Sequence, residues 1–157
     1  GDNWGFSPLE EGLRPVEGFA VDVREIPHKG GRTFGFRISD GRHAIAYLSD
    51  HFPLAAGPGP DGLGAYHDAA LALADGVDVL MHDAQFVATQ FPQVAYLGHS
   101  AVEYAIGLAA SANAKSLLLF HHAPARTDDE LDAIVEATRD APLPVTAAVE
   151  GAELDFS

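Results

Sequence analysis

The stretch that decides the fold runs from residue 19 to residue 50 and reads FAVDVREIPHKGGRTFGFRISDGRHAIAYLSD. Apolar and polar residues alternate over residues 19–26 and the pattern stops at Pro27, which predicts a strand. Residues 33–38 and 44–48 predict two more strands, each preceded by a turn that contains glycine. Because the turns are short, we expect the three strands to pair as an antiparallel meander.

The rest of the chain alternates helices with strands. Helices are predicted over 65–75, 100–112 and 127–139, and strands over 77–81, 116–120, 145–149 and 153–156. Capping boxes at Ser100-x-x-Glu103 and Thr127-x-x-Glu130 are expected to open the second and third helices. A meander followed by such alternation predicts an α/β fold with a mixed sheet. Residues 18–157 form the predicted domain, and residues 1–17 are expected to be a linker or the tail of a missing N-terminal half.

Composition excludes several classes of protein. The 157 residues fit one domain or a large piece of one. Nine Lys and Arg against 23 Asp and Glu give a net charge of −14, which repels phosphate backbones and disfavours general nucleic-acid binding. No apolar run approaches the ~20 residues of a membrane span. The absence of cysteine excludes disulfides and thiolate metal sites and suits a cytoplasmic protein. The start at Gly1, without Met or signal peptide, favours a fragment.

Polar side chains follow hydrophobic strands at four points. They are His28, Asp50, the pair His82-Asp83 and the pair His121-His122. Strand ends are where ligands gather in α/β sheets. Imidazole and carboxylate without thiolate are the ligand set of zinc, manganese or iron in hydrolytic sites. The four strand ends therefore predict a metal site.

Each of these residues also has a plainer interpretation. A single His after a strand is usually a surface or hydrogen-bonded residue, and Asp50 by itself would be a turn or helix-cap residue. Agreement among four strand ends favours the site. Of the other histidines, we expect His51 in a second layer or at the rim, His43 at a strand start and His67 on a helix.

Five motifs in order resemble the C-terminal part of a metallo-β-lactamase-fold hydrolase. They read IPH (26–28) with FGFR (34–37), AYLSD (46–50), HDAQ (82–85), GHSAVE (98–103) and LLFH (118–121). The likeness covers residues 18–140 and is nearest to the ribonuclease Z and phosphodiesterase-like branch. It implies half of an αββα sandwich, with two divalent metal ions, usually zinc, at the sheet edge.

The resemblance also implies roles for individual residues. His28 and His121 would each hold one metal ion and Asp50 would bridge the two, with a metal-bound hydroxide as the nucleophile. His99 would protonate the leaving oxygen and Asp83 would orient His99; His82 belongs to the same catalytic set. Hydroxyl-bearing residues of the ribonuclease Z motifs are absent at positions 85 and 101, which disfavours transfer-RNA processing. We therefore expect a small-molecule or phosphodiester substrate.

The family signature His-x-His-x-Asp-His is absent from the sequence. Because that signature supplies most of the metal ligands, the chain is expected to be inactive without an N-terminal half-domain, from the same gene or a separate chain. A homodimer is a further candidate assembly. Two alternatives stay open: a thioester, lactone or lactam hydrolase of the same fold, and a non-catalytic scaffold. A flavodoxin-like domain is disfavoured by the meander and by the missing phosphate loop.

Overall fold

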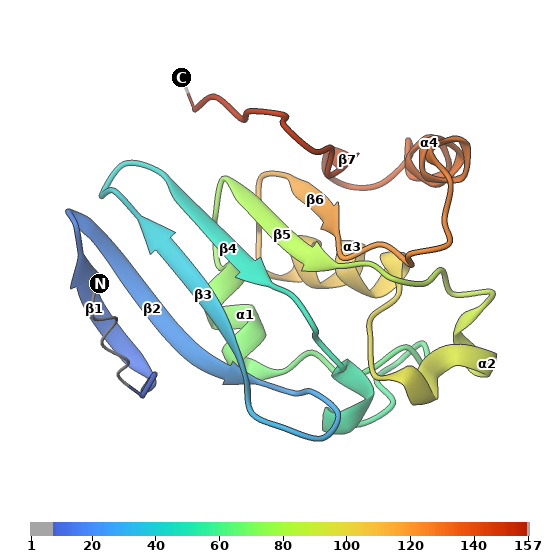
Figure 1. Cartoon of the computed structure of the whole chain (residues 1–157), viewed down its shortest axis with the longest axis horizontal. Coiled ribbons are helices and arrows are strands. Elements are labelled where there is room, and N and C mark those ends of the chain that lie inside the picture. The colour runs from blue at the N-terminus through green and yellow to red at the C-terminus, as the bar shows by residue number, and fades with distance from the viewer. Residues whose placement is uncertain (1–7, 157) are drawn as a thin grey trace, which may run out of the picture.

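The computed structural model describes residues 8–156, which form a seven-stranded sheet whose strands lie in sequence order (Figure 1). The strands are β1 (Gly12–Val16), β2 (Phe19–Ile26), β3 (Thr33–Ser39), β4 (Ala44–Leu48), β5 (Val79–Asp83), β6 (Leu117–Phe120) and β7 (Val145–Ala147). Strands β1 to β4 pair antiparallel, and β4 to β7 pair parallel. The predicted meander and the mixed sheet are both confirmed.

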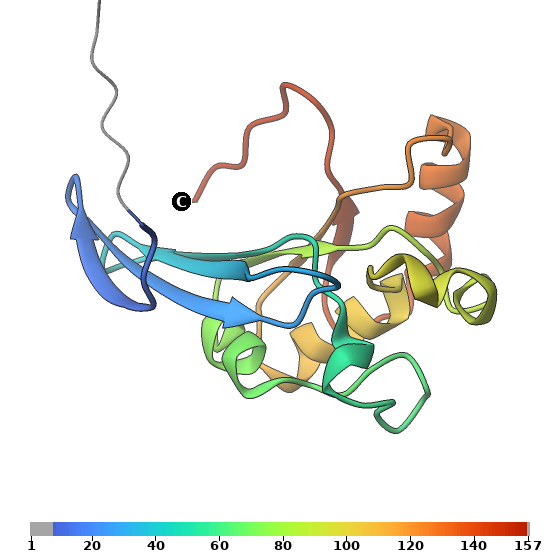
Figure 2. The same cartoon turned by 60° about the horizontal axis from the view of Figure 1, so that its bottom comes forward.

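Helices fill the connections between the parallel strands, because a parallel pair needs a crossover. They are α1 (Asp68–Ala74), α2 (Phe91–Val94), α3 (Val102–Ser111) and α4 (Asp128–Ala137), with short 3-10 turns η1 (Pro53–Ala56) and η2 (Ala95–Leu97). Helices α1 and α3 lie on one face of the sheet (Figure 2). Leu73 and Leu108 of these helices pack in one buried cluster with Leu48, Leu80 and Leu119 of the strands. Within residues 8–156, no helix combines the length and the apolar character that a membrane crossing needs.

The opposite face of the sheet is apolar and has no helix against it in the described part of the chain (Figure 2). Ile45, Met81 and Phe120 alternate with the helix-facing residues of their strands and so point to this side. The C-terminal segment, residues 148–156, crosses this face and encloses a cavity of about 500 Å³ with it. The cover is a single extended segment, so much of the face stays accessible.

Two predictions about the ends of the chain are wrong. Of the two alternatives for residues 1–17, a linker or the tail of a missing N-terminal half, the linker is wrong for residues 12–16, because they form β1, which pairs with β2. Four of the five β1 residues are exposed, so this strand lacks the alternation of buried and exposed positions that reveals strands in a sequence. Residues 1–7 lie outside the described residues. The predicted strand over 153–156 is also wrong, because these residues form an extended segment outside the sheet.

Of the two predicted capping boxes, one is confirmed and one is wrong. The Thr127 capping box is confirmed, with both of its reciprocal hydrogen bonds present. The Ser100 capping box is wrong, because Ala101 is the N-cap of α3. The Ser100 hydroxyl donates instead to the His51 carbonyl, and the Glu103 carboxylate accepts from the Ala88 amide. Both polar side chains are thus used in tertiary contacts.

Candidate metal centre

Four segments bring polar side chains to one edge of the sheet. Strands β4, β5 and β6 are parallel, so their carboxyl ends meet at the same edge. Asp50 lies two residues beyond β4, Asp83 ends β5, and His121 directly follows β6. His99 enters from the loop that precedes α3. The edge therefore collects two carboxylates and two imidazoles.

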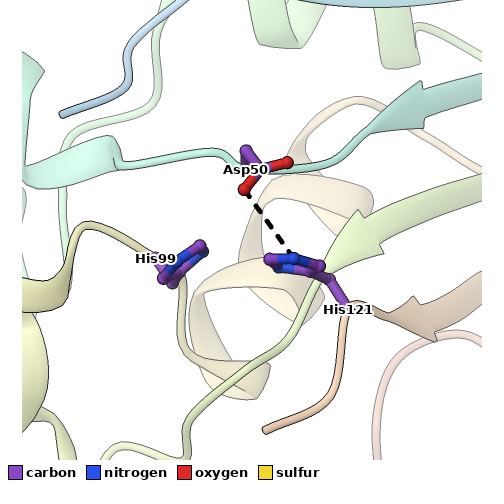
Figure 3. Close-up of side chains that lie close together, drawn as sticks. All are labelled: Asp50, His99 and His121. Carbon is purple, nitrogen blue, oxygen red and sulfur yellow. Dashed lines mark ion pairs between the residues drawn. The ribbon is translucent and has the colours of Figure 1, made fainter. Parts of the chain in front are cut away.

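Asp50, His99 and His121 lie close together at this edge, and we call them the tight group (Figure 3). One ligand atom from each lies within 4.8 Å of the others. The Nε2 atom of His121 is 3.7 Å from the Oδ1 atom of Asp50. Two imidazole nitrogens with one carboxylate oxygen form a donor set that zinc accepts in catalytic sites. The residues present therefore fit a divalent metal ion.

The carboxylate of Asp83 contacts both histidines at their Nδ1 atoms. Its Oδ2 atom accepts a hydrogen bond from Nδ1 of His99 at 2.8 Å and lies 3.4 Å from Nδ1 of His121. Its Oδ1 atom accepts from the amides of Gln85 and Ser100. Because the carboxylate only accepts, both rings turn Nδ1 toward it and leave Nε2 for a metal ion or a substrate. Histidine ligands of metal ions are oriented by a carboxylate in this way.

The charges at the edge follow from these contacts. Burial acts to raise the pKa of Asp83, but the close contacts of its carboxylate with His121 and His99 outweigh burial and hold that pKa at about 2. The 3.4 Å contact with the Asp83 carboxylate raises the pKa of His121, against the opposing effect of burial. Asp83 is therefore an anion at neutral pH, and it stabilises positive charge at His121, whether that charge is a proton or a metal ion.

The backbone is unusual at two of these residues. Asp50 and His121 have φ angles of 52° and 55°, in the left-handed region. Only two other non-glycine residues in the described chain, Glu17 and Asn113, have positive φ. Such conformations cost energy and cluster at functional sites, where they aim side chains that a regular strand end would direct elsewhere.

Two residues predicted for the site lie outside the tight group. His28 follows β2, and the centre of its ring is 6.0 Å from that of His99. The Nδ1 atom of His28 is buried and makes no hydrogen bond to any described residue. His28 thus borders the group without joining it.

The position of His82 corrects its predicted catalytic role. His82 precedes Asp83 on β5, so the two side chains point to opposite faces of the sheet, and His82 is fully buried. A side chain in that place does not touch a substrate. His51 is also fully buried, which excludes the predicted rim position and leaves the second layer. His67 is the N-cap of α1, one residue outside the helix.

The resemblance placed His99 at the leaving group of the same site, but no local sequence pattern indicates that it groups with Asp50 and His121. The residue comes from a loop far from either strand end in the sequence, and its proximity depends on the Asp83 hydrogen bond. The motif HDAQ followed by GHSAVE was the one signal available, because it contains both partners of this bond.

Comparisons with solved structures agree with the fold. The chain is similar to the metallo-beta-lactamase fold protein YhfI from Bacillus subtilis, with a TM-score of 0.70 and 22% identity over 94% of this chain and 54% of that protein. It is similar to a diphosphatase from the PhnP family, with a TM-score of 0.65 and 19% identity over 96% of this chain and 48% of that one. The short form of human tRNase Z gives a TM-score of 0.54 and 24% identity over 69% of this chain and 38% of that enzyme.

The chain thus spans about half, or less, of the length of these proteins. A search of curated proteins found no match. A family model described as "Beta-lactamase superfamily domain" matches residues 8–122, which include β1 to β6 and every residue of the tight group. The resemblance to the metallo-β-lactamase fold is confirmed. This chain belongs to the beta-lactamase superfamily domain family.

Proposed function

We propose that this chain is the C-terminal half of a metal-dependent hydrolase that cleaves a phosphodiester or ester bond. The observation that carries the proposal is the convergence of two proposed ligands, Asp50 and His121, with a third polar group, His99, within 4.8 Å of one another, backed by the buried carboxylate of Asp83. Ordinary surface histidines do not share one buried carboxylate. Membership in a family of mostly metal-dependent hydrolases supports the same conclusion.

The proposed cofactor is a pair of divalent metal ions, zinc in the first place and manganese or iron as alternatives. Asp50, His121 and His28 are the proposed ligands from this chain, with Asp50 between the ions. Bound metal ions would supply a water molecule acidic enough to attack near neutral pH. The side chain of Asp50 is 47% exposed, which leaves its carboxylate accessible to ligands on two sides.

We assign His99 to the leaving group rather than to the metal. Its Nδ1–H donates to Asp83 at 2.8 Å, a hydrogen bond that fixes the ring. The Nε2 atom then faces the group that contains Asp50 and His121, where a proton can pass to the leaving oxygen. His121 has a longer contact to Asp83, 3.4 Å, and retains the ligand role.

The rest of the site is proposed to come from an N-terminal half-domain that covers the open face of the sheet. The apolar side chains of Ile45, Met81 and Phe120 on that face support this packing, and so does the coverage of about half of YhfI. That half would carry the His-x-His-x-Asp-His ligands. A homodimer of this chain would leave those ligands missing.

The half-domain proposal gives a prediction about solubility. Produced by itself, the chain is expected to aggregate because its apolar face is exposed, and co-production with the N-terminal half should give a soluble complex. Size-exclusion chromatography with light scattering measures both. Met81→Lys should make the isolated chain more soluble and weaken the complex, whereas Met81→Leu should resemble the wild type. A cooperatively melting monomer of the unmodified chain would contradict the proposal.

The reaction class is tested on the full-length protein with chromogenic substrates. We expect hydrolysis of a bis(aryl) phosphodiester that stops after chelation and returns when zinc is added. Cleavage of thioesters or lactones without phosphodiester cleavage would support the alternative function, a thioester or lactone hydrolase of the same fold. If the protein takes up no metal and cleaves none of these substrates, the result would support the second alternative, a non-catalytic scaffold domain.

A further inference from the structure

A second set of polar side chains lies behind the candidate metal centre. We call His51, His82 and Ser100 the buried layer, because all three are fully buried. Each is the direct chain neighbour of a residue at the site edge: His51 follows Asp50, His82 precedes Asp83, and Ser100 follows His99. The mechanism proposed above uses none of the three, so their burial needs another explanation.

The members of the buried layer are joined to one another. Nδ1 of His51 lies 2.9 Å from Nε2 of His82, and the Ser100 hydroxyl donates to the His51 carbonyl at 2.7 Å. Nδ1 of His82 lies 2.7 Å from the carbonyl of Asp83. The first two bonds connect the loop after β4, the end of β5 and the loop before α3, which are three of the segments that carry the site, and the third fixes the His82 ring within β5.

The direction of each bond follows from the carbonyl at its end. A carbonyl only accepts, so Nδ1 of His82 donates to Asp83 and Nε2 of the neutral ring is an acceptor. Nδ1 of His51 must therefore donate to His82, and its Nε2 carries no proton. Full burial favours the neutral form of both rings. The Nε2 atom of His51 is buried and has no hydrogen-bond partner among the described residues.

That unpartnered nitrogen argues against a purely stabilising role. A buried acceptor without a partner lowers stability, and apolar side chains of similar shape would fill the same space without this cost. The rings are nevertheless held firmly, because both pack against Tyr104 with ring centres 5.6 and 5.7 Å away. We therefore interpret the two imidazoles as a fixed connection between the segments that carry the site, and not as core packing.

We propose that the buried layer sets the relative positions of Asp50, Asp83 and His99, an inference that rests on the proposed function. Asp50 has left-handed backbone, so the direction of its carboxylate depends on how the next residue, His51, is anchored. Catalytic sites tolerate displacements of only about 0.5 Å in their side chains. His51, His82 and Ser100 are therefore positioning residues, which act through their neighbours and touch neither metal ion nor substrate.

The chain offers a matched control for Ser100. Ser116 also donates its hydroxyl to a carbonyl at 2.7 Å, that of Asp78, at the other end of the parallel strands. In the full-length protein, Ser100→Ala should weaken zinc binding by about 10-fold or more, as loss of ligand-supporting hydrogen bonds does, and should change the visible spectrum of bound Co²⁺. Ser116→Ala should leave zinc affinity and that spectrum unchanged.

A conservative variant of His51 distinguishes a positioning role from a packing role. The amide nitrogen of Asn can take the place of Nδ1, so His51→Asn should keep zinc affinity close to that of the wild type. His51→Leu keeps the bulk but not the donor, and should lose about 10-fold or more. Equal zinc affinities and identical Co²⁺ spectra in all four variants would overturn the proposal, because the buried layer would then be core packing.

A readout without metal keeps this inference distinct from the proposed function. In the metal-free protein, the NMR signal of the His99 Nδ1 proton reports its hydrogen bond to Asp83. Ser100→Ala should shift that signal, and Ser116→Ala should not. If the wild type takes up no zinc, the proposed function is wrong, and this signal still decides the positioning claim: an unchanged signal in Ser100→Ala would overturn it.

Discussion

Asp50→Asn is expected to remove at least one metal ion and nearly all hydrolytic activity from the full-length protein, while the fold is retained. The substitution keeps the shape of the side chain and removes the negative charge that would balance two cations. Its structural cost should be small, because the one ion pair of Asp50 among the described residues is the 3.7 Å contact with His121. Metal content by mass spectrometry, activity and circular dichroism measure the three effects.

Asp78→Asn is the control for this variant. The pKa of Asp78 is lowered to about 2, mainly by its hydrogen bond from Lys115, and its carboxylate accepts a hydrogen bond from the Ala44 amide. It lies at the other end of β5 from the candidate metal centre. Asp78→Asn should keep its metal ions and activity. Full metal stoichiometry in Asp50→Asn would show that Asp50 is a turn residue.

The second large effect is expected for His99→Ala. A positioned acid–base group contributes about 10²–10⁴-fold to a rate, so the variant should slow by a factor in that range and keep its metal ions. A leaving group of low pKa needs little protonation, so aryl esters should lose less than alkyl esters. Rates for both substrate types, with metal content as the control, measure this. Loss of metal from His99→Ala would make His99 a ligand and overturn its assignment.

The structure changes what is expected of Asp83. Sequence reasoning gave it a single task, the orientation of His99, but it also lies 3.4 Å from Nδ1 of His121. Asp83→Ala should therefore weaken metal binding as well as slow the reaction. At saturating zinc, the double variant with His99→Ala should be hardly slower than His99→Ala, because residues that act as a unit are not additive. If the rate losses of the Asp83→Ala and His99→Ala variants were additive, and equal for aryl and alkyl esters, the pair Asp83 and His99 would have a structural role only.

The parts of the fold that were predictable are those with a buried and an exposed side. β4 alternates between buried and half-buried positions, and apolar and polar residues alternate in the sequences of β2 and β3, whereas β1 is exposed along nearly its whole length and gives no such signal. The capping box at Thr127 formed because its helix is on the surface, with no competing partners. Ser100 and Glu103 have the same spacing, but tertiary contacts take both side chains.

The candidate site was predictable where it depends on strand ends. Asp50 and His121 follow hydrophobic strands, and parallel pairing brings them together. His82 could have been excluded from the sequence, because neighbours on one strand face opposite sides and Asp83 was already assigned to the site. The approach of His99 depends on a hydrogen bond between distant segments, which no local pattern encodes.

The most direct test of the central claim is anomalous diffraction at the zinc edge from crystals of the full-length protein grown with zinc. We predict strong anomalous peaks at the carboxyl edge of the parallel strands, with Asp50 oxygen and His121 Nε2 as ligands at about 2.0–2.2 Å. Zinc bound elsewhere, or no peak beside an Asp50 and a His121 that contact only each other, would contradict the assignment of this edge as a metal centre.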